Sequence, residues 1–104
     1  MGIQVKRQFK QTNYQVDTEG NVYGPWKKLK PQSTSGYHKV TVYEGSKSDS
    51  KQLYIHRMVA ETFIPNPKEY KEVNHKNGVK TDNRVQNLEW CDRQYNIDHY
   101  WENK

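Results

Sequence analysis

Hydrophobic residues alternate with polar ones through the first half of the chain, which is typical of half-buried β-strands. Segments 39–43 and 52–55 each place two aliphatic side chains on one face, and the polar stretch between them predicts a hairpin. Segments 14–16 and 21–23 flank the turn at 17–20 and predict a second, shorter hairpin. The first half therefore reads as antiparallel β-structure.

The hydrophobic period changes after residue 55. Segment 56–63 predicts a helix, which the prolines at 65 and 67 end. The predicted helix presents one face made of Met58, Val59, Thr62 and Phe63.

Segment 31–36, composed of Pro, Gln, Ser, Thr and Gly, predicts a loop in the first half of the chain.

The last third of the chain returns to short strands before a final helix. Segments 73–75 and 87–90 predict two strands, and Asn77-Gly78 predicts a turn after the first of them. A helix is predicted over 93–103, with Asp92 as its N-cap. The expected buried stripe of this helix is Ile97, Tyr100 and Trp101.

The composition indicates a folded domain with a small core. Val, Leu, Ile and Phe make up 18 of 104 residues, a fraction that in a highly charged chain would favour disorder. The net charge is only +5, however, and 13 residues are aromatic, so rings are expected to supply much of the burial. The single cysteine, Cys91, excludes an internal disulfide and is expected in the core. No apolar run is long enough to cross a membrane, and no membrane partner is expected.

Positive charge is concentrated in the first half. Residues 1–56 hold nine Lys and Arg against four Asp and Glu, whereas residues 57–104 hold eight of each. Basic residues interleaved with aromatic rings are typical of surfaces that bind a nucleic acid backbone, although a solvated, solubilising face has the same composition. The basic residues in question are Lys27, Lys28, Lys30 and Lys39.

The candidate chemistry lies in Val-Asn-His-Lys-Asn-Gly at 73–78, followed by Asn-Leu-Glu-Trp at 87–90 and by Asn96. His75, Asn87 and Asn96 are separated by 12 and then 9 positions. Together with the stretches 56–67 and 83–91, this array resembles the HNH endonucleases, in particular the free-standing and intron-encoded homing endonucleases of phages. A lone Asn-His pair would carry no weight, but the full spacing is specific.

The resemblance implies an α+β fold within one compact chain. Residues 1–55 are expected to form an N-terminal antiparallel β module that is basic and binds DNA. Residues 56–104 are expected to form the catalytic unit of the family, the ββα-metal (HNH) nuclease unit.

The resemblance also implies a role for each polar residue of the array. His75 would be the general base that activates water, and Asn87 would hold the loop that positions it. Asn96 and Asn74 would ligate a divalent cation, Mg²⁺ or Mn²⁺, although many relatives have Asp where this chain has Asn74. The chemistry agrees, because a neutral imidazole accepts a proton near pH 7 and hard cations prefer oxygen ligands.

Three further residues have open assignments. Arg57 is expected to meet either a DNA phosphate or a buried carboxylate, and we include it with the four lysines as a DNA contact. His99 shares a helical face with Asn96, so it is either an additional metal or phosphate contact or a surface residue. His56 is expected to be a packing residue.

The sequence thus predicts a divalent-metal-dependent endonuclease that nicks or cuts double-stranded DNA, of the phage homing type, in the cytoplasm of a phage-infected bacterium. The alternative is a non-catalytic DNA-binding protein on a decayed HNH scaffold, because Asn74 removes a negative charge from the expected metal site. A monomer and a homodimer both fit the sequence, which also leaves the target site open.

Overall fold

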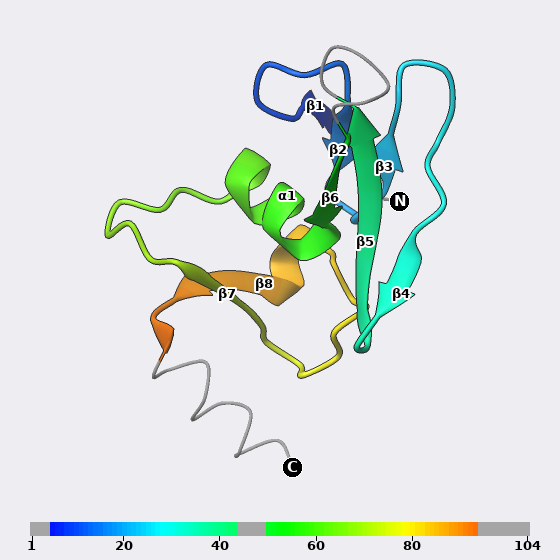
Figure 1. Cartoon of the computed structure of the whole chain (residues 1–104). Coiled ribbons are helices and arrows are strands. Elements are labelled where there is room, and N and C mark those ends of the chain that lie inside the picture. The colour runs from blue at the N-terminus through cyan, green and yellow to red at the C-terminus, as the bar shows by residue number, and fades with distance from the viewer. Residues whose placement is uncertain (1–4, 44–49, 94–104) are drawn as a thin grey trace.

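The computed structural model describes residues 5–43 and 50–93, which form three small antiparallel sheets around one α-helix (Figure 1). The first sheet has the order β1-β2-β3, with β1 at Lys6–Gln8, β2 at Gln15–Asp17 and β3 at Val22–Tyr23. Pairing of β2 with β3 confirms the shorter predicted hairpin. The sequence did not predict β1, because its three side chains are all exposed and its strand character comes from pairing with β2.

The second sheet has the order β4-β5-β6, with β4 at Gln32–Thr34, β5 at Tyr37–Tyr43 and β6 at Ser50–Tyr54. The long hairpin of β5 and β6 confirms the other predicted hairpin. The prediction of a loop over 31–36 was wrong, because β4 pairs with the start of β5. Ser35 and Gly36 both have positive φ, as a tight two-residue hairpin turn requires.

The helix α1 (Ile55–Phe63) begins directly after β6 and confirms the predicted change of period. Ile55, predicted to be the last strand residue, is instead the first helical one. The backbone N–H of Ile64 donates to the carbonyl of Ala60, and Pro65 follows, which ends the helix. The buried face of α1 contains Ile55, His56, Met58, Val59 and Ala60.

The third sheet is a ribbon of β7 (Glu72–His75) and β8 (Leu88–Cys91), preceded by a short 3₁₀ helix, η1 (Val85–Asn87). Both predicted strands are confirmed, but Asn87 ends η1 rather than opening β8. In the ribbon, Asn74 lies opposite Glu89. Almost all of the predicted final helix lies outside the described residues.

One hydrophobic core joins the three sheets. Helix α1 lies at its centre, between the β5–β6 hairpin and the β7–β8 ribbon (Figure 1), and contacts β2 as well. The core includes residues from both sides of position 55, so the division into a DNA-binding part and a catalytic part remains a functional prediction. The architecture confirms an α+β fold. No helix in the described ranges is long and apolar enough to span a membrane.

Candidate active site

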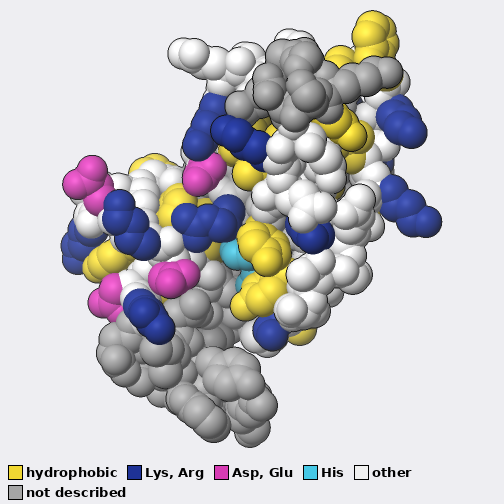
Figure 2. Space-filling view, viewed as in Figure 1, with side chains coloured by type: hydrophobic (Ala, Val, Ile, Leu, Met, Phe, Trp, Pro, Cys, Tyr) yellow, Lys and Arg dark blue, Asp and Glu magenta, His cyan; other side chains and the backbone are white. Residues whose placement is uncertain are grey.

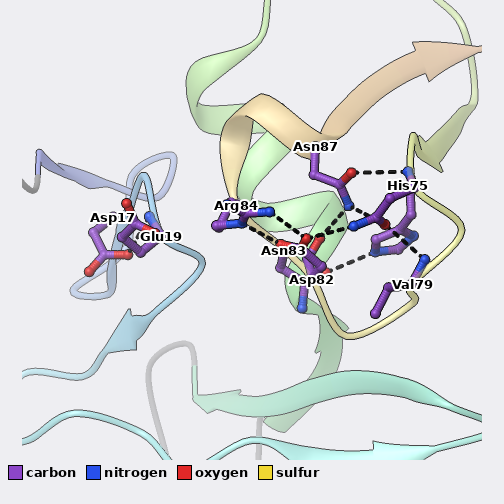
Figure 3. Close-up of polar contacts among 9 residues, drawn as sticks. Asp17, Glu19, His75, Val79, Asp82, Asn83, Arg84 and Asn87 are labelled. Atoms are coloured by element: carbon purple, nitrogen blue, oxygen red, sulfur yellow. Dashed lines mark hydrogen bonds and ion pairs between the residues drawn. The ribbon is translucent and has the colours of Figure 1, made fainter. Parts of the chain in front are cut away.

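His75 is the last residue of β7, and its side chain is buried, with 6% of its surface exposed. The ring atom Nε2 lies 2.9 Å from Oδ1 of Asn83, a residue of the loop between β7 and β8 (Figure 3). Asn83 is buried as well, so this hydrogen bond is shielded from water. The bond connects the end of the strand to the loop that follows it.

Two aromatic rings pack against the imidazole. The ring centroid of His56, on α1, lies 4.9 Å from that of His75, and the Tyr37 ring lies 6.0 Å away. Tyr37 also stacks on His56 at 5.2 Å, and the Lys80 ammonium lies over the Tyr37 ring. Figure 2 shows histidine side-chain surface beside hydrophobic side chains, with Lys and Arg side chains nearby. The predicted packing role of His56 agrees with these contacts.

The surroundings of His75 favour its neutral form. Burial, the largest influence, lowers its pKa. The hydrogen bond to Asn83 and the carboxylate of Asp82 act in the opposite direction, but the pKa stays below its ordinary value of 6.5. An imidazole with a lowered pKa is unprotonated near pH 7 and available as a proton acceptor.

Asn87 ties together the loop between β7 and β8. Its Oδ1 accepts a hydrogen bond from the backbone N–H of Asn77 at 3.1 Å. Its Nδ2 donates to Oδ1 of Asn77 at 3.0 Å and to the carbonyl of Asp82 at 2.9 Å. These contacts join both ends of the loop, which is the structural part of the role expected for Asn87; its effect on catalysis stays a prediction.

The same loop is closed a second time by Asp82. Its carboxylate accepts two hydrogen bonds from Arg84, each 2.7 Å long, and one from Nδ2 of Asn77 at 2.8 Å (Figure 3). The Arg84 contact is the main reason that the pKa of Asp82 is lowered to about 2. The carboxylate therefore remains charged throughout the ordinary pH range.

Asn74, an expected metal ligand, is buried with 5% of its surface exposed. Within the described part of the chain, its Nδ2 has no hydrogen-bond partner. An amide nitrogen does not ligate a hard cation, so only Oδ1 of this side chain qualifies as a ligand, and Mg²⁺ needs few protein ligands because it keeps several waters. No group of three His, Cys, Asp or Glu that could hold a metal occurs among the described residues. Asn96 and His99 lie outside them.

The expected DNA contacts lie on several elements. Lys27, Lys28 and Lys30 are exposed on the segment between β3 and β4. Lys39 is half-buried on β5 and donates to Oε1 of Gln52 at 2.7 Å. The neighbouring Trp26 is 93% exposed, so the ring and the lysines beside it are open to a partner.

Arg57 lies on α1 and is only half-buried. Its Nη1 donates to the backbone carbonyl of Lys71 at 2.9 Å. This bond connects the start of the helix to the segment that leads into β7. A DNA phosphate as a further partner remains a prediction.

Sequence reasoning missed Asn83, the direct partner of His75. The residue falls in a polar loop, where asparagine is ordinarily explained by turn formation. His75 and Asn83 are eight positions apart, and no local sequence pattern indicates a hydrogen bond between residues at that separation. Knowledge of how the loop returns toward β7 was required to find it.

A comparison with protein families matches residues 53–97 to the family described as HNH endonuclease. Two uncharacterized HNH endonucleases of Acanthamoeba polyphaga mimivirus are similar to this chain. One is 38% identical over 85% of this chain and 27% of its own length. The other is 40% identical over 86% of this chain and 23% of its own length. The DNA endonuclease I-HmuI of Bacillus phage SP01 is 36% identical over 89 residues, which are 83% of this chain and half of that protein.

The same protein is found among solved structures. A structure that concerns DNA binding and cleavage by the HNH homing endonuclease I-HmuI superposes with a TM-score of 0.84 and 32% identity. The match covers 94% of this chain and 58% of that one, so the chain spans about half the length of I-HmuI and about a quarter of the two mimivirus proteins. The residues matched by the family model include α1, the β7–β8 ribbon and the loop between these two strands. On these grounds the chain belongs to the HNH endonuclease family.

Proposed function

We propose that this protein is a divalent-metal-dependent DNA endonuclease that hydrolyses phosphodiester bonds. The observation that carries the proposal is the position of His75, a neutral and firmly held imidazole that directly follows the buried oxygen donor of Asn74. Similarity to I-HmuI, whose structure concerns DNA binding and cleavage, supports DNA as the substrate class.

His75 acts as the general base of this reaction. Its free ring nitrogen takes a proton from a water molecule, and the water oxygen attacks the phosphorus in line with the departing 3′ oxygen. Proton uptake changes a neutral ring into a cation, and the carboxylate of Asp82 favours that charge. The neighbouring rings of His56 and Tyr37 hold the imidazole in place during the step.

Asn74 and Asn96 are the proposed ligands of the cation, Mg²⁺ or Mn²⁺. When bound, the ion supplies positive charge that neutralises the phosphate and the leaving oxygen. Asn74 offers a neutral oxygen in place of the carboxylate that many relatives have at this position. We therefore expect weaker metal affinity than a carboxylate ligand gives.

The basic residues bind the DNA backbone in this proposal. Lys27, Lys28 and Lys30 are exposed and contact phosphates of the duplex, with further contacts from Lys39 and Arg57. His99 is an additional candidate contact to the metal or the phosphate. I-HmuI is a homing endonuclease from a Bacillus phage, which supports a homing role, with the cytoplasm of a phage-infected bacterium as the proposed place of action.

The second candidate function is DNA binding without cleavage on a decayed HNH scaffold. The neutral side chain of Asn74 favours it, as does the lack of an acidic metal cluster in the described residues. Both functions share the basic surface, so a binding measurement does not distinguish them. Cleavage does.

The test is incubation of supercoiled plasmid with the protein and Mg²⁺ or Mn²⁺, with a chelator as the control. We expect nicked or linear plasmid with metal and intact plasmid with the chelator. A protein that binds the plasmid but leaves it supercoiled in both metals would establish the second function instead.

A further inference from the structure

We propose that Asn83 is a positioning residue that holds His75 in one tautomer, with the proton on Nε2 and Nδ1 free to accept a proton, and that the turn between β2 and β3 supports Asn83 in this role. The catalytic consequence rests on the proposed function. The tautomer itself does not depend on whether the protein cleaves DNA.

The tautomer follows from the chemistry of the hydrogen bond. The atom of Asn83 that faces the ring is Oδ1, at 2.9 Å from Nε2 (Figure 3). An amide oxygen only accepts hydrogen bonds, so Nε2 must carry the hydrogen and donate it. A neutral imidazole has one N–H, which leaves the lone pair on Nδ1. Because both residues are nearly buried, loss of this bond would leave polar atoms without water to replace it.

The turn between β2 and β3 packs directly against the backbone of Asn83. Gly20 has a φ of +88°, and a Cβ atom at this position would lie 2.8 Å from the carbonyl oxygen of Asn83 and 2.9 Å from its Cβ. Only glycine fits this approach without displacing the loop. The backbone N–H of Val85 also donates to the carbonyl of Thr18 at 2.9 Å, which connects the same two segments a second time.

The turn is itself held by a fully buried carboxylate. Asp17 accepts hydrogen bonds from the backbone N–H groups of Glu19 and Asn21, at 3.0 and 2.8 Å. It also accepts from Nδ2 of Asn21 at 3.0 Å and from the hydroxyl of Tyr23 at 2.8 Å. A buried and fully bonded carboxylate fixes the shape of the turn, which makes the turn a rigid support.

The loop is anchored on the other side of Asn83 as well. Asp82, its neighbour, is held by Arg84 through its carboxylate and by Asn87 through its carbonyl. Asn83 therefore lies between the support of the β2–β3 turn and the anchored part of the loop. Its Oδ1 is thereby kept at a fixed position relative to the end of β7.

The direct test is nitrogen NMR of histidine-labelled protein at a pH where the ring is neutral, because protonated and unprotonated ring nitrogens have clearly separated chemical shifts. We expect wild-type His75 to show the proton on Nε2. Asn83→Ala should shift the population toward the tautomer with the proton on Nδ1. Asn83→Asp, which keeps an acceptor oxygen, should retain the wild-type tautomer.

Steady-state kinetics of DNA cleavage separates an effect on the position of His75 from an effect on substrate binding. Asn83→Ala should lower kcat by about 10- to 100-fold, with little change in KM, because a misoriented base affects the chemical step. Gly20→Ala should change the tautomer and kcat in the same direction, since its Cβ displaces Asn83. The matched control is Asn66→Ala, which removes an asparagine that bonds to Tyr70 in another loop, and it should leave the tautomer unchanged.

A wild-type His75 with its proton on Nδ1 would overturn the proposal even if no variant folds. An Asn83→Ala protein that loses activity while His75 keeps the proton on Nε2 would also overturn it, because Asn83 would then have a structural role only. Absence of cleavage by the wild-type protein, with the expected tautomer intact, would count against the proposed function and not against this positioning.

Discussion

The imidazole rings of His56 and His75 pack against each other with their centroids 4.9 Å apart. One ring comes from α1 and the other from β7, and both are nearly buried. Burial lowers both pKa values, and in His56, where the nearby His75 and Arg57 add to the effect, the pKa falls to about 3. The folded protein therefore holds two adjacent imidazoles in the neutral form.

This pair makes stability depend on pH in a defined direction. Below the ordinary histidine pKa of 6.5 the unfolded chain binds a proton at His56, whereas the folded chain does so only near pH 3. The free energy of unfolding should thus fall as the pH is lowered from 6.5, by about 3 kcal/mol at about pH 4.5 from the shift of His56 alone. Urea denaturation over this range measures the change.

His56→Phe provides the control, because it keeps a ring in the stack and removes the titration. Its free energy of unfolding should depend less steeply on pH than that of the wild type. The carboxyls add their own loss only at lower pH: hydrogen bonds outweigh the burial of Asp17 and lower its pKa, as Arg84 does for Asp82. Identical pH profiles for wild type and variant between pH 6.5 and about 4.5 would contradict this account.

Asn87 should contribute to stability through the loop it ties together. Asn87→Ala removes three part-buried hydrogen bonds that tie the loop together, so we expect the free energy of unfolding to fall by about 2–3 kcal/mol. Gln86→Ala, at the exposed neighbouring position, should change it by less than about 0.5 kcal/mol. Equal effects of the two substitutions in urea denaturation would show that the loop is held by other contacts.

The exposed lysines should set the salt dependence of DNA binding. Replacing Lys27, Lys28 and Lys30 with alanine should weaken binding and reduce the slope of log K against log salt by about 2–3, since each phosphate contact contributes about 0.9. Fluorescence anisotropy with a labelled duplex at several salt concentrations measures both. Replacement of Lys68 and Lys71, exposed lysines of the second half, is the control. An unchanged slope in the triple variant would place the DNA on another surface.

Asn74→Asp should restore the negative charge that the proposed metal site lacks. We expect it to keep or improve cleavage, and to reduce the Mg²⁺ concentration needed for half-maximal rate by about tenfold, because carboxylates bind hard cations more strongly than amides do. A metal titration of the cleavage rate measures this. A clear loss of activity at every Mg²⁺ concentration would show that residue 74 is not a ligand.

Local sequence patterns predicted those elements whose side chains are sorted between core and solvent. Val40 and Val42 on β5 and the apolar face of α1 are buried, and their periods of two and 3.6 residues are visible in the sequence. The strands β1 and β4 lack such a signal because they expose most of their side chains. They form because their backbones complete the sheets begun by β2 and β5.

The candidate site could be predicted only where a residue type and a family spacing coincided. His75 and Asn87 were singled out in this way, and both make hydrogen bonds to the loop between β7 and β8, while their catalytic roles stay predictions. Asn83 and Gly20 were not, because their roles depend on the approach of two segments that are distant in the sequence. The positive φ of Gly20 is compatible with an ordinary turn, and the contact that demands glycine is tertiary.

In the proposed reaction, the imidazole of His75 performs the chemical step. Single-turnover cleavage of a duplex at saturating enzyme and Mg²⁺ measures this step, with His75→Ala compared with wild type and with His38→Ala, a histidine on β5. We predict that His75→Ala binds DNA normally and cleaves at least about 100-fold more slowly, while His38→Ala cleaves at the wild-type rate. Equal cleavage rates for wild type and His75→Ala would show that a group other than His75 activates the water.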